Sequence, residues 1–316
     1  MSFFFILSGF VLSISVASRN LKSRPPRKTF IAKQLAKFYP LHILMLCIFV
    51  LLSIKATGNI DITKLLLNIL LLQSWIPDNS FNFAFNGVSW FLSDIIFFYF
   101  LFPWLHSKIV YSPLKRLIQC IVVIILLYTA FVLSVPDNLV NTLVYVFPLA
   151  RCMDFAAGIL LYRIYQTDFT QSLKLFFENN SKKAAVILAE TIVIFIVVVT
   201  FIAYGSLPVK ISCASIFWLP LSAIIYISSV TDNAGGPLSR LLHNHIALWL
   251  GGLSLNFFMS HLLVIYAGNV LSTHYTVNSG YIMTALAEIC LTVTFAFILK
   301  KYFTDKIYSL LKKTRY

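Results

Sequence analysis

Long, uninterrupted apolar runs are the feature that most constrains this chain of 316 residues. A helix of about 20 apolar residues crosses the hydrocarbon core of a bilayer. A backbone can cross lipid only as a helix or as a closed barrel, and these runs do not alternate with period two. Only 11% of the residues are charged, whereas about 25% is usual in soluble domains. The pattern therefore predicts an all-α, polytopic transmembrane helical bundle.

The runs predict nine membrane-spanning helices and one short helix that lies at the interface or dips into the membrane. The spans are expected at residues 3–17, 38–55, 88–107, 115–135, 141–163, 184–204, 209–229, 245–269 and 281–301. The short helix is expected at 62–75, which is too short to cross. Because the loops between the runs are short, we expect one membrane domain over residues 1–316.

The distribution of Lys and Arg predicts the orientation. Of 25 such residues, 21 lie in loops on one side or in the carboxyl-terminal tail, and three lie in the opposite loops. Cytoplasmic loops carry the excess of Lys and Arg. We therefore expect the amino terminus outside and the carboxyl terminus in the cytoplasm. The net charge of +14 indicates topology and attraction to anionic lipid, not nucleic-acid binding.

Polar groups inside spans are costly and are therefore functional candidates. Asp94, Arg151 and His261 are such groups. Arg151 and Asp154 are three residues apart, so they either neutralise each other on one helix face or belong to a site. His261 either forms a structural hydrogen bond between helices or takes part in catalysis. Glu190 is expected to pair with another inward-facing polar group.

The cysteines and histidines do not show metal-ligand spacing. No two cysteines form a C-x-x-C pair, and His243 and His245 are two residues apart, so they point to different helix faces. We expect no bound metal or cofactor, and we interpret the cysteines as small apolar filling.

Five segments together resemble one family. They are FFFILSGFVL at 3–12, FIAKQLAKFYP at 30–40, GVSWFLSDIIFFYFLFP at 87–103, RCMDFAAG at 151–158 and GGLSLNFFMSHLLV at 251–264. In this order they are similar to the motifs of the acyltransferase 3 family, the integral membrane O-acyltransferases of the O-antigen acetylase type. The five segments extend over nearly the whole chain.

The resemblance implies a transferase of the bacterial inner membrane that moves an acyl group, expected to be acetyl, from acyl-CoA to a sugar hydroxyl. The acceptor would be a surface polysaccharide such as lipopolysaccharide, or its lipid-linked precursor. Arg151 would supply positive charge, and His261 or Asp94 would serve as the base. Lys37, with Lys33 beside it, would contact a phosphate group of acyl-CoA. The basic segment that also holds Arg24, Arg27 and Lys28 would attract acyl-CoA electrostatically. Ser8, Gly9, Trp90 and Ser93 would line the substrate cavity.

The chain also departs from the family pattern. In the family, a first span with an arginine and an essential histidine precedes the segment that residues 3–12 match. We expect that this span is missing here and that this chain alone transfers acyl groups slowly or not at all. The family's glutamate falls at Ile95, and Asp94 lies about 100° away around a helix. Two alternatives stay open: a flippase or exporter of a lipid-linked sugar, for which internal symmetry would be expected, and a structural remnant without activity.

Overall fold

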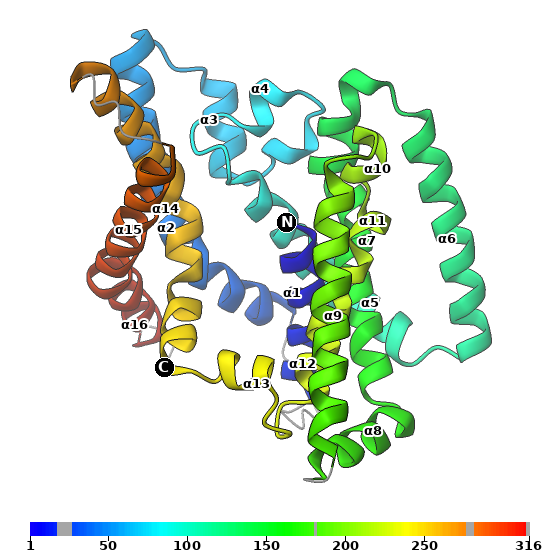
Figure 1. Ribbon diagram of the computed structural model, residues 1–316. Helices are drawn as coiled ribbons and strands as arrows, with labels where there is room; N and C mark the ends of the chain where they lie inside the picture. Colours follow the sequence, from blue (N-terminus) through cyan, green and yellow to red (C-terminus); the bar gives the residue numbers. More distant parts are fainter. Residues whose placement is uncertain (18–26, 180–181, 276–280, 314–316) are drawn as a thin grey trace. The chain divides into compact units, whose positions relative to one another are not determined.

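The computed structural model describes residues 1–17, 27–179, 182–275 and 281–313, and these contain helices and no strand (Figure 1). The chain divides into two compact, interleaved units. The first unit comprises Met1–Arg27 and Asp94–Asn244, and the second comprises Lys28–Ser93 and His245–Tyr316. Each unit is described by itself below. A single domain over residues 1–316 stays a prediction.

The structure confirms a helical membrane protein. Among the described residues, five helices are long and apolar enough to cross a bilayer, or six if one bent pair counts as a single span. The five are Thr29–Thr57, Leu114–Ser134, Lys183–Tyr204, His245–Val270 and Ile282–Leu310. The runs expected at 3–17 and 209–229 form shorter helices, and the run at 88–107 forms a helix that does not meet the same criteria. The count of nine spans therefore stays a prediction.

The first unit is built around two helices that lie side by side, α1 (Ser2–Ala17) and α7 (Pro148–Tyr165) (Figure 1). The unit also contains α5 (Trp90–Val110) from Asp94 onward, α6 (Leu114–Ser134), the short turn η2 (Asp137–Leu139), the π-helix η3 (Asn141–Val146), α8 (Asp168–Glu178) and α9 (Lys183–Tyr204). It ends with α10 (Val209–Cys213), α11 (Ser215–Trp218), η5 (Leu219–Leu221), α12 (Ser222–Val230) and α13 (Pro237–Leu242). Ile6 and Phe10 of α1 pack with Tyr162 of α7 in a buried cluster.

Two glycines allow α1 and α7 to touch backbone to backbone. A Cβ atom on Gly9 would lie 2.2 Å from the carbonyl oxygen of Phe155, and one on Gly158 would lie 2.0 Å from that of Ile6. No other residue fits at these distances. Small residues at such contacts let membrane helices associate closely. The LSGF and FAAG segments therefore form the central helix contact of the first unit.

Two of the expected spans are broken, which corrects the sequence prediction. The run at 141–163 bends by 43° between Asp137–Val146 and Pro148–Tyr165. Phe147 at the break is extended, with ψ of 127°, and Pro148 starts the next helix, where its missing N–H costs nothing. The run at 209–229 is interrupted at Ala214, which is also extended, with ψ of 140°.

The second unit contains the two long helices α2 (Arg27–Thr57) and α14 (His245–Tyr275). Between them in sequence come α3 (Ile62–Ile69), η1 (Gln73–Trp75) and α4 (Asn79–Asn82), and after them α15 (Tyr281–Leu299), the π-helix η6 (Lys300–Thr304) and α16 (Asp305–Lys313). Helix α15 packs along α14. Helix α2 starts eleven residues before the expected boundary at 38, so Lys33 and Lys37 are helical and not in a loop.

The short helix expected at 62–75 exists but ends early. It stops at Ile69, and Leu71 adopts a left-handed conformation with φ of 55°. The chain then forms the 3₁₀ turn at Gln73–Trp75. This turn buries the Gln73 and Ser74 side chains, which donate to the Ser89 and Ser93 hydroxyls, respectively.

The five cysteines are free, and Cys47, Cys120 and Cys290 are exposed. The interpretation of the cysteines as small apolar filling stays a prediction.

Candidate active site

The centre of the first unit holds a buried ion pair on α7. The Arg151 Nη1 atom lies 3.1 Å from the Asp154 Oδ2 atom, and neither side chain is exposed at all. The spacing of three residues places both on one helix face. Of the two alternatives, the structure shows the pair on one helix face, and a role of the same pair in a site stays a prediction.

Arg151 has further partners in two other segments. Nη1 donates to the Ser2 hydroxyl of α1 at 3.1 Å, and Nε donates to the Tyr145 carbonyl oxygen at 2.6 Å. The guanidinium carbon lies 4.7 Å from the centre of the Tyr145 ring. The carbonyl of Tyr145 is accessible because the helix breaks at Phe147, and carbonyls at such a break lose their helical donors. The bend thus creates the acceptor that positions Arg151.

The pair keeps unused hydrogen-bonding capacity. Within the described residues, Arg151 Nη2 and Asp154 Oδ1 have no hydrogen-bond partner. A buried donor without a partner costs free energy, and such groups are found where a ligand or a reacting group supplies the missing bond. Arg151 therefore has a buried N–H group that is free to donate one further hydrogen bond within the described residues.

Serine hydroxyls and a tyrosine surround this face of α7. The Ser215 hydroxyl donates to the Ala150 carbonyl oxygen at 3.3 Å, and the Ser215 backbone N–H donates to the Tyr128 hydroxyl at 2.9 Å. Sequence reasoning did not identify Ser215. The signal that could have found it is Ala214–Ser215 in the middle of an apolar run, where the chain breaks.

The other predicted residues of the first unit have separate environments. Asp94 is fully buried on α5. Gly9 lies at the contact with α7, which gives it a packing role, and Ser8 beside it is half-buried. Glu190 behaves as expected: its Oε1 accepts from the Thr231 hydroxyl at 3.0 Å, and its Oε2 accepts from the Leu238 N–H at 2.8 Å.

His261 lies on α14 in the second unit. Its Nδ1 is 2.7 Å from the carbonyl oxygen of Phe258, and its ring stacks on that of Phe257 with centroids 6.2 Å apart. A carbonyl only accepts, so Nδ1 carries the proton and Nε2 is left as the acceptor. This tautomer is the one that a general base requires.

Trp90 and Ser93 are buried in the second unit. Ser93 takes part in a network of serine and amide side chains: its hydroxyl donates to the Leu71 carbonyl oxygen at 2.6 Å, and the Ser74 hydroxyl donates to it at 2.6 Å. The Ser89 hydroxyl donates to Asn68 Oδ1 at 3.2 Å. The SWFLS segment is therefore fixed to the turn after α3.

The network includes a histidine that sequence reasoning missed. His42 of α2 is fully buried, and its Nε2 lies 2.9 Å from the Asn68 carbonyl oxygen. In the described part of the chain, its Nδ1 atom has no hydrogen-bond partner. A histidine inside the run FYPLHILML was a visible signal, because an imidazole within a span is costly.

The lysines predicted to contact phosphate lie on the amino-terminal part of α2. Lys33 and Lys37 are exposed and one helical turn apart, so they share a face. Arg24 lies outside the described residues, as do the side chains of Arg27 and Lys28.

The family model described as Acyltransferase domain, Acyl_transf_3, matches residues 1–301. The chain belongs to this acyltransferase family. The resemblance seen in the five motifs is thus confirmed.

Within this acyltransferase family, the chain is 30% identical over 183 residues to Acyltransferase MdmB of Streptomyces mycarofaciens. The alignment covers 52% of the chain and 46% of that relative, so the chain matches about half of the relative's length. No solved structure matches the chain. The predicted site residues are divided between the units, with Ser8, Gly9, Asp94 and Arg151 in the first and Lys33, Lys37, Trp90, Ser93 and His261 in the second. Their common site stays a prediction.

Proposed function

We propose that this chain is a multi-pass O-acyltransferase that moves an acetyl group from acetyl-CoA to a hydroxyl of a cell-surface polysaccharide or of its lipid-linked precursor. Membership of the acyltransferase family supports the class of reaction. The observation that carries the proposal for this chain is the buried Arg151, whose Nη2 donor has no partner among the residues that the structure describes. A buried cation with a spare donor suits the developing oxyanion of acyl transfer.

In the proposed reaction, the acceptor hydroxyl oxygen attacks the thioester carbonyl carbon. A C–O bond forms, the C–S bond breaks, and the coenzyme A thiolate leaves. Arg151 stabilises the negative charge on the carbonyl oxygen. A general base takes the hydroxyl proton and passes it to the thiolate sulfur, and the two candidates for this base are His261 and Asp94.

Electrostatics support a cytoplasmic donor. Coenzyme A carries phosphates, and Lys33 and Lys37 present two charges on one exposed face of α2. Each lysine acts as a point charge without the bidentate geometry of arginine. In the proposed orientation, the carboxyl-terminal tail and this face of α2 lie on the cytoplasmic side of a bacterial inner membrane.

The test is an acetyl-transfer assay with protein purified into nanodiscs. Release of free coenzyme A thiol and acetylation of an added O-antigen polysaccharide are measured together. His261→Ala is expected to lower the rate by about 10²–10⁴-fold, the usual contribution of a general base. His243→Ala is the matched control, because His243 is an exposed histidine that pairs with Asp232.

Arg151→Lys separates charge from geometry. It keeps the positive charge near Asp154 but removes the Nη2 donor, so the acetylation rate is expected to fall while acetyl-CoA affinity stays close to that of the wild type. The proposed roles are contradicted if coenzyme A thiol is released without an acceptor. They are also contradicted if acceptor acetylation is unchanged in both His261→Ala and Arg151→Lys. Transport of a lipid-linked sugar without acetylation contradicts the proposed function itself.

A further inference from the structure

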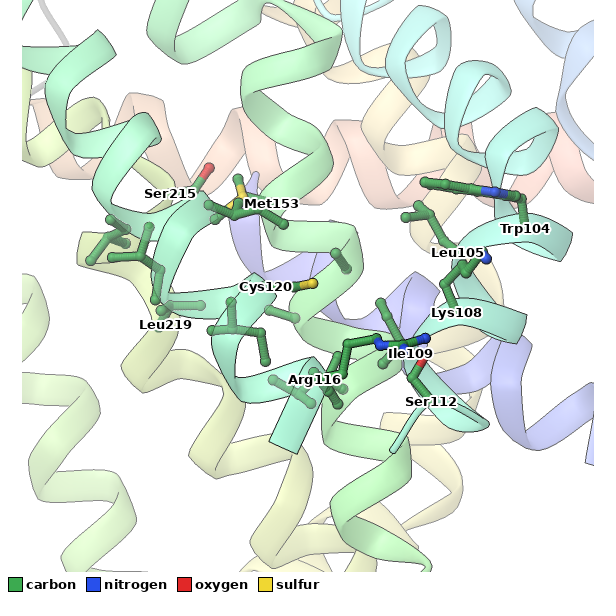
Figure 2. Close-up of a pocket in the computed structure, with 18 residues that line it drawn as sticks. Trp104, Leu105, Lys108, Ile109, Ser112, Arg116, Cys120, Met153, Ser215 and Leu219 are labelled. Carbon is green, nitrogen blue, oxygen red and sulfur yellow. The ribbon is translucent and has the colours of Figure 1, made fainter. Parts of the chain in front are cut away.

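A pocket of about 500 Å³ lies entirely within the first unit, against α5, α6 and α7 (Figure 2). Fourteen of its eighteen lining residues are apolar, and the exceptions are Lys108, Ser112, Arg116 and Ser215. Trp104, which is 59% exposed, and Ile124, which is 47% exposed, show that the pocket is open on one side. In a membrane protein, such an opening at helix surfaces faces lipid. The pocket is therefore a groove with a hydrocarbon-like wall.

The polar residues gather at the ends of the groove. Figure 2 shows Arg116 and Ser112 at one end, with Lys108 along α5 on the same side, whereas Ser215 and Met153 lie at the opposite end. Lys108 and Arg116 flank the short connection between α5 and α6, which the charge distribution predicts to be cytoplasmic. The basic end is thus expected at the level of the lipid headgroups.

The two cations are available for an external partner. Both side chains are exposed. Neither Lys108 nor Arg116 takes part in the ion pairs that the described residues form. The basic partners in those pairs are Lys64, Arg151, Lys210 and His243. A cation at the membrane surface attracts anionic lipid. The combination of an apolar groove and a basic end therefore fits an amphipathic anion.

The lining distinguishes between two such anions. The pantetheine arm of acyl-CoA contains amide groups, and an amide buried without a hydrogen bond is costly. Apart from the basic end, the polar side-chain groups of the wall are few: the Ser215 hydroxyl, which already donates to Ala150, the Trp104 indole N–H and the weakly polar Cys120 thiol. A hydrocarbon chain needs no polar partner. The groove therefore favours a lipid over the acyl donor.

We propose that this groove binds an anionic phospholipid of the cytoplasmic leaflet, with its phosphate at Lys108 and Arg116 and one acyl chain along α6 and α7. The proposal does not depend on the transferase reaction. It assigns to the first unit a lipid site whose lining includes neither Arg151 nor Asp154.

The experiment compares phosphatidylglycerol with phosphatidylcholine of identical chains, bound to the purified full chain and counted by native mass spectrometry. Wild-type protein is expected to retain phosphatidylglycerol preferentially. Arg116→Gln and Lys108→Gln are each expected to lower this preference about fivefold, and Arg116→Lys is expected to restore most of it. Lys115→Gln is the matched control, because Lys115 is exposed beside Arg116 and does not line the groove.

A second pair of variants tests the apolar part. Cys120 lines the groove and is exposed, so Cys120→Trp is expected to fill it and to weaken binding of either lipid. Val123→Trp on the same helix is exposed outside the groove and serves as the control. In the wild type, phosphatidylglycerol should slow alkylation of Cys120 but not of Cys290, which is also exposed.

The outcomes are decisive in both directions. Equal retention of the two lipids, unchanged in Arg116→Gln and in Cys120→Trp, overturns the proposal. Displacement of phosphatidylglycerol by acetyl-CoA at equimolar concentration, with protection of Cys120, also overturns it and assigns the groove to the donor. Variants are compared only when they elute as monodisperse species with the wild-type unfolding temperature. The alkylation of Cys120 in the wild-type protein tests the proposal even if a variant fails to fold.

Discussion

Gly158 of α7 touches the backbone of Ile6 in α1 so closely that an added Cβ atom would lie 2.0 Å from the Ile6 carbonyl oxygen. The nearest atoms are backbone atoms, so no side chain can move aside. Gly158→Ala and Gly9→Ala should each force the two helices apart and destabilise the protein by about 1–3 kcal/mol, as overpacking does. Thermal unfolding in detergent measures the effect.

Gly251→Ala is the control for these substitutions. Gly251 is helical in α14, and a Cβ there would meet no atom within 4 Å. Since alanine is the better helix former by about 1 kcal/mol, this variant should be as stable as the wild type or more stable. A similar loss in all three variants would show that the α1–α7 contact is not responsible.

Removing one partner of the Arg151–Asp154 pair should be strongly destabilising. Arg151→Ala leaves the Asp154 carboxylate buried without its cation, which costs about 3–5 kcal/mol. The double variant Arg151→Met/Asp154→Leu should lose much less than the sum of the single variants, because no charge is left unpaired. The exposed pair Lys210–Asp137, 3.1 Å apart with Asp137 91% exposed, is the reference, and Lys210→Ala should cost less than about 1 kcal/mol.

His42 should matter more for stability than the neighbouring Tyr39. His42 donates from Nε2 to the buried Asn68 carbonyl, and Tyr39 donates to the partly buried Ile69 carbonyl at 3.0 Å. His42→Leu leaves a buried acceptor without its donor, at a cost of about 1–3 kcal/mol. Tyr39→Phe should cost less. Chemical denaturation of the purified variants gives the order, and a larger loss for Tyr39→Phe would contradict it.

The amino-terminal cap of α4 should depend on pH. The Ser80 N–H donates to Asp78 Oδ1 at 2.7 Å, and this hydrogen bond holds the pKa of the Asp78 carboxyl below its usual value of 3.8. Because the pKa of Asp78 is lower in the folded state, the charged cap stabilises the folded state fully at pH values above the unfolded-state pKa. This stabilisation is lost as the pH falls through the folded-state pKa. The protection of the Ser80 amide against hydrogen exchange, relative to an unstructured peptide at the same pH, should therefore fall below about pH 4. Asp78→Asn keeps an uncharged cap and should remove this dependence.

The orientation can be tested directly in cells. Reporters fused near Pro77 should be extracytoplasmic, and reporters near Asn179 should be cytoplasmic, because the latter loop carries the basic residues. A cytoplasmic signal near Pro77 would contradict the assignment.

The sequence predicted the membrane class and the family, and it offered the Arg151–Asp154 pair as one of two alternatives, because each depends on local composition or on a fixed spacing. The fate of Glu190 was also predictable, since a carboxylate within a span needs donors. The break at Phe147 was harder to foresee: Pro148 is visible, but proline at the first position of a helix is tolerated. The left-handed Leu71 could not be predicted, because glycine or asparagine is expected there. The His42–Asn68–Ser89 network depends on three segments that meet only after folding.

The interleaving of the two units affects synthesis as well as structure. Residues 28–93 leave the ribosome early, but their partners in the second unit begin at His245, after the 151 residues 94–244. At synthesis rates of 5–20 residues per second, this delay lasts roughly 8–30 s. Throughout that time, the segment with His42 must stay in the membrane without the helices that complete its unit. The nascent chain therefore needs either a waiting conformation or help from the insertion machinery.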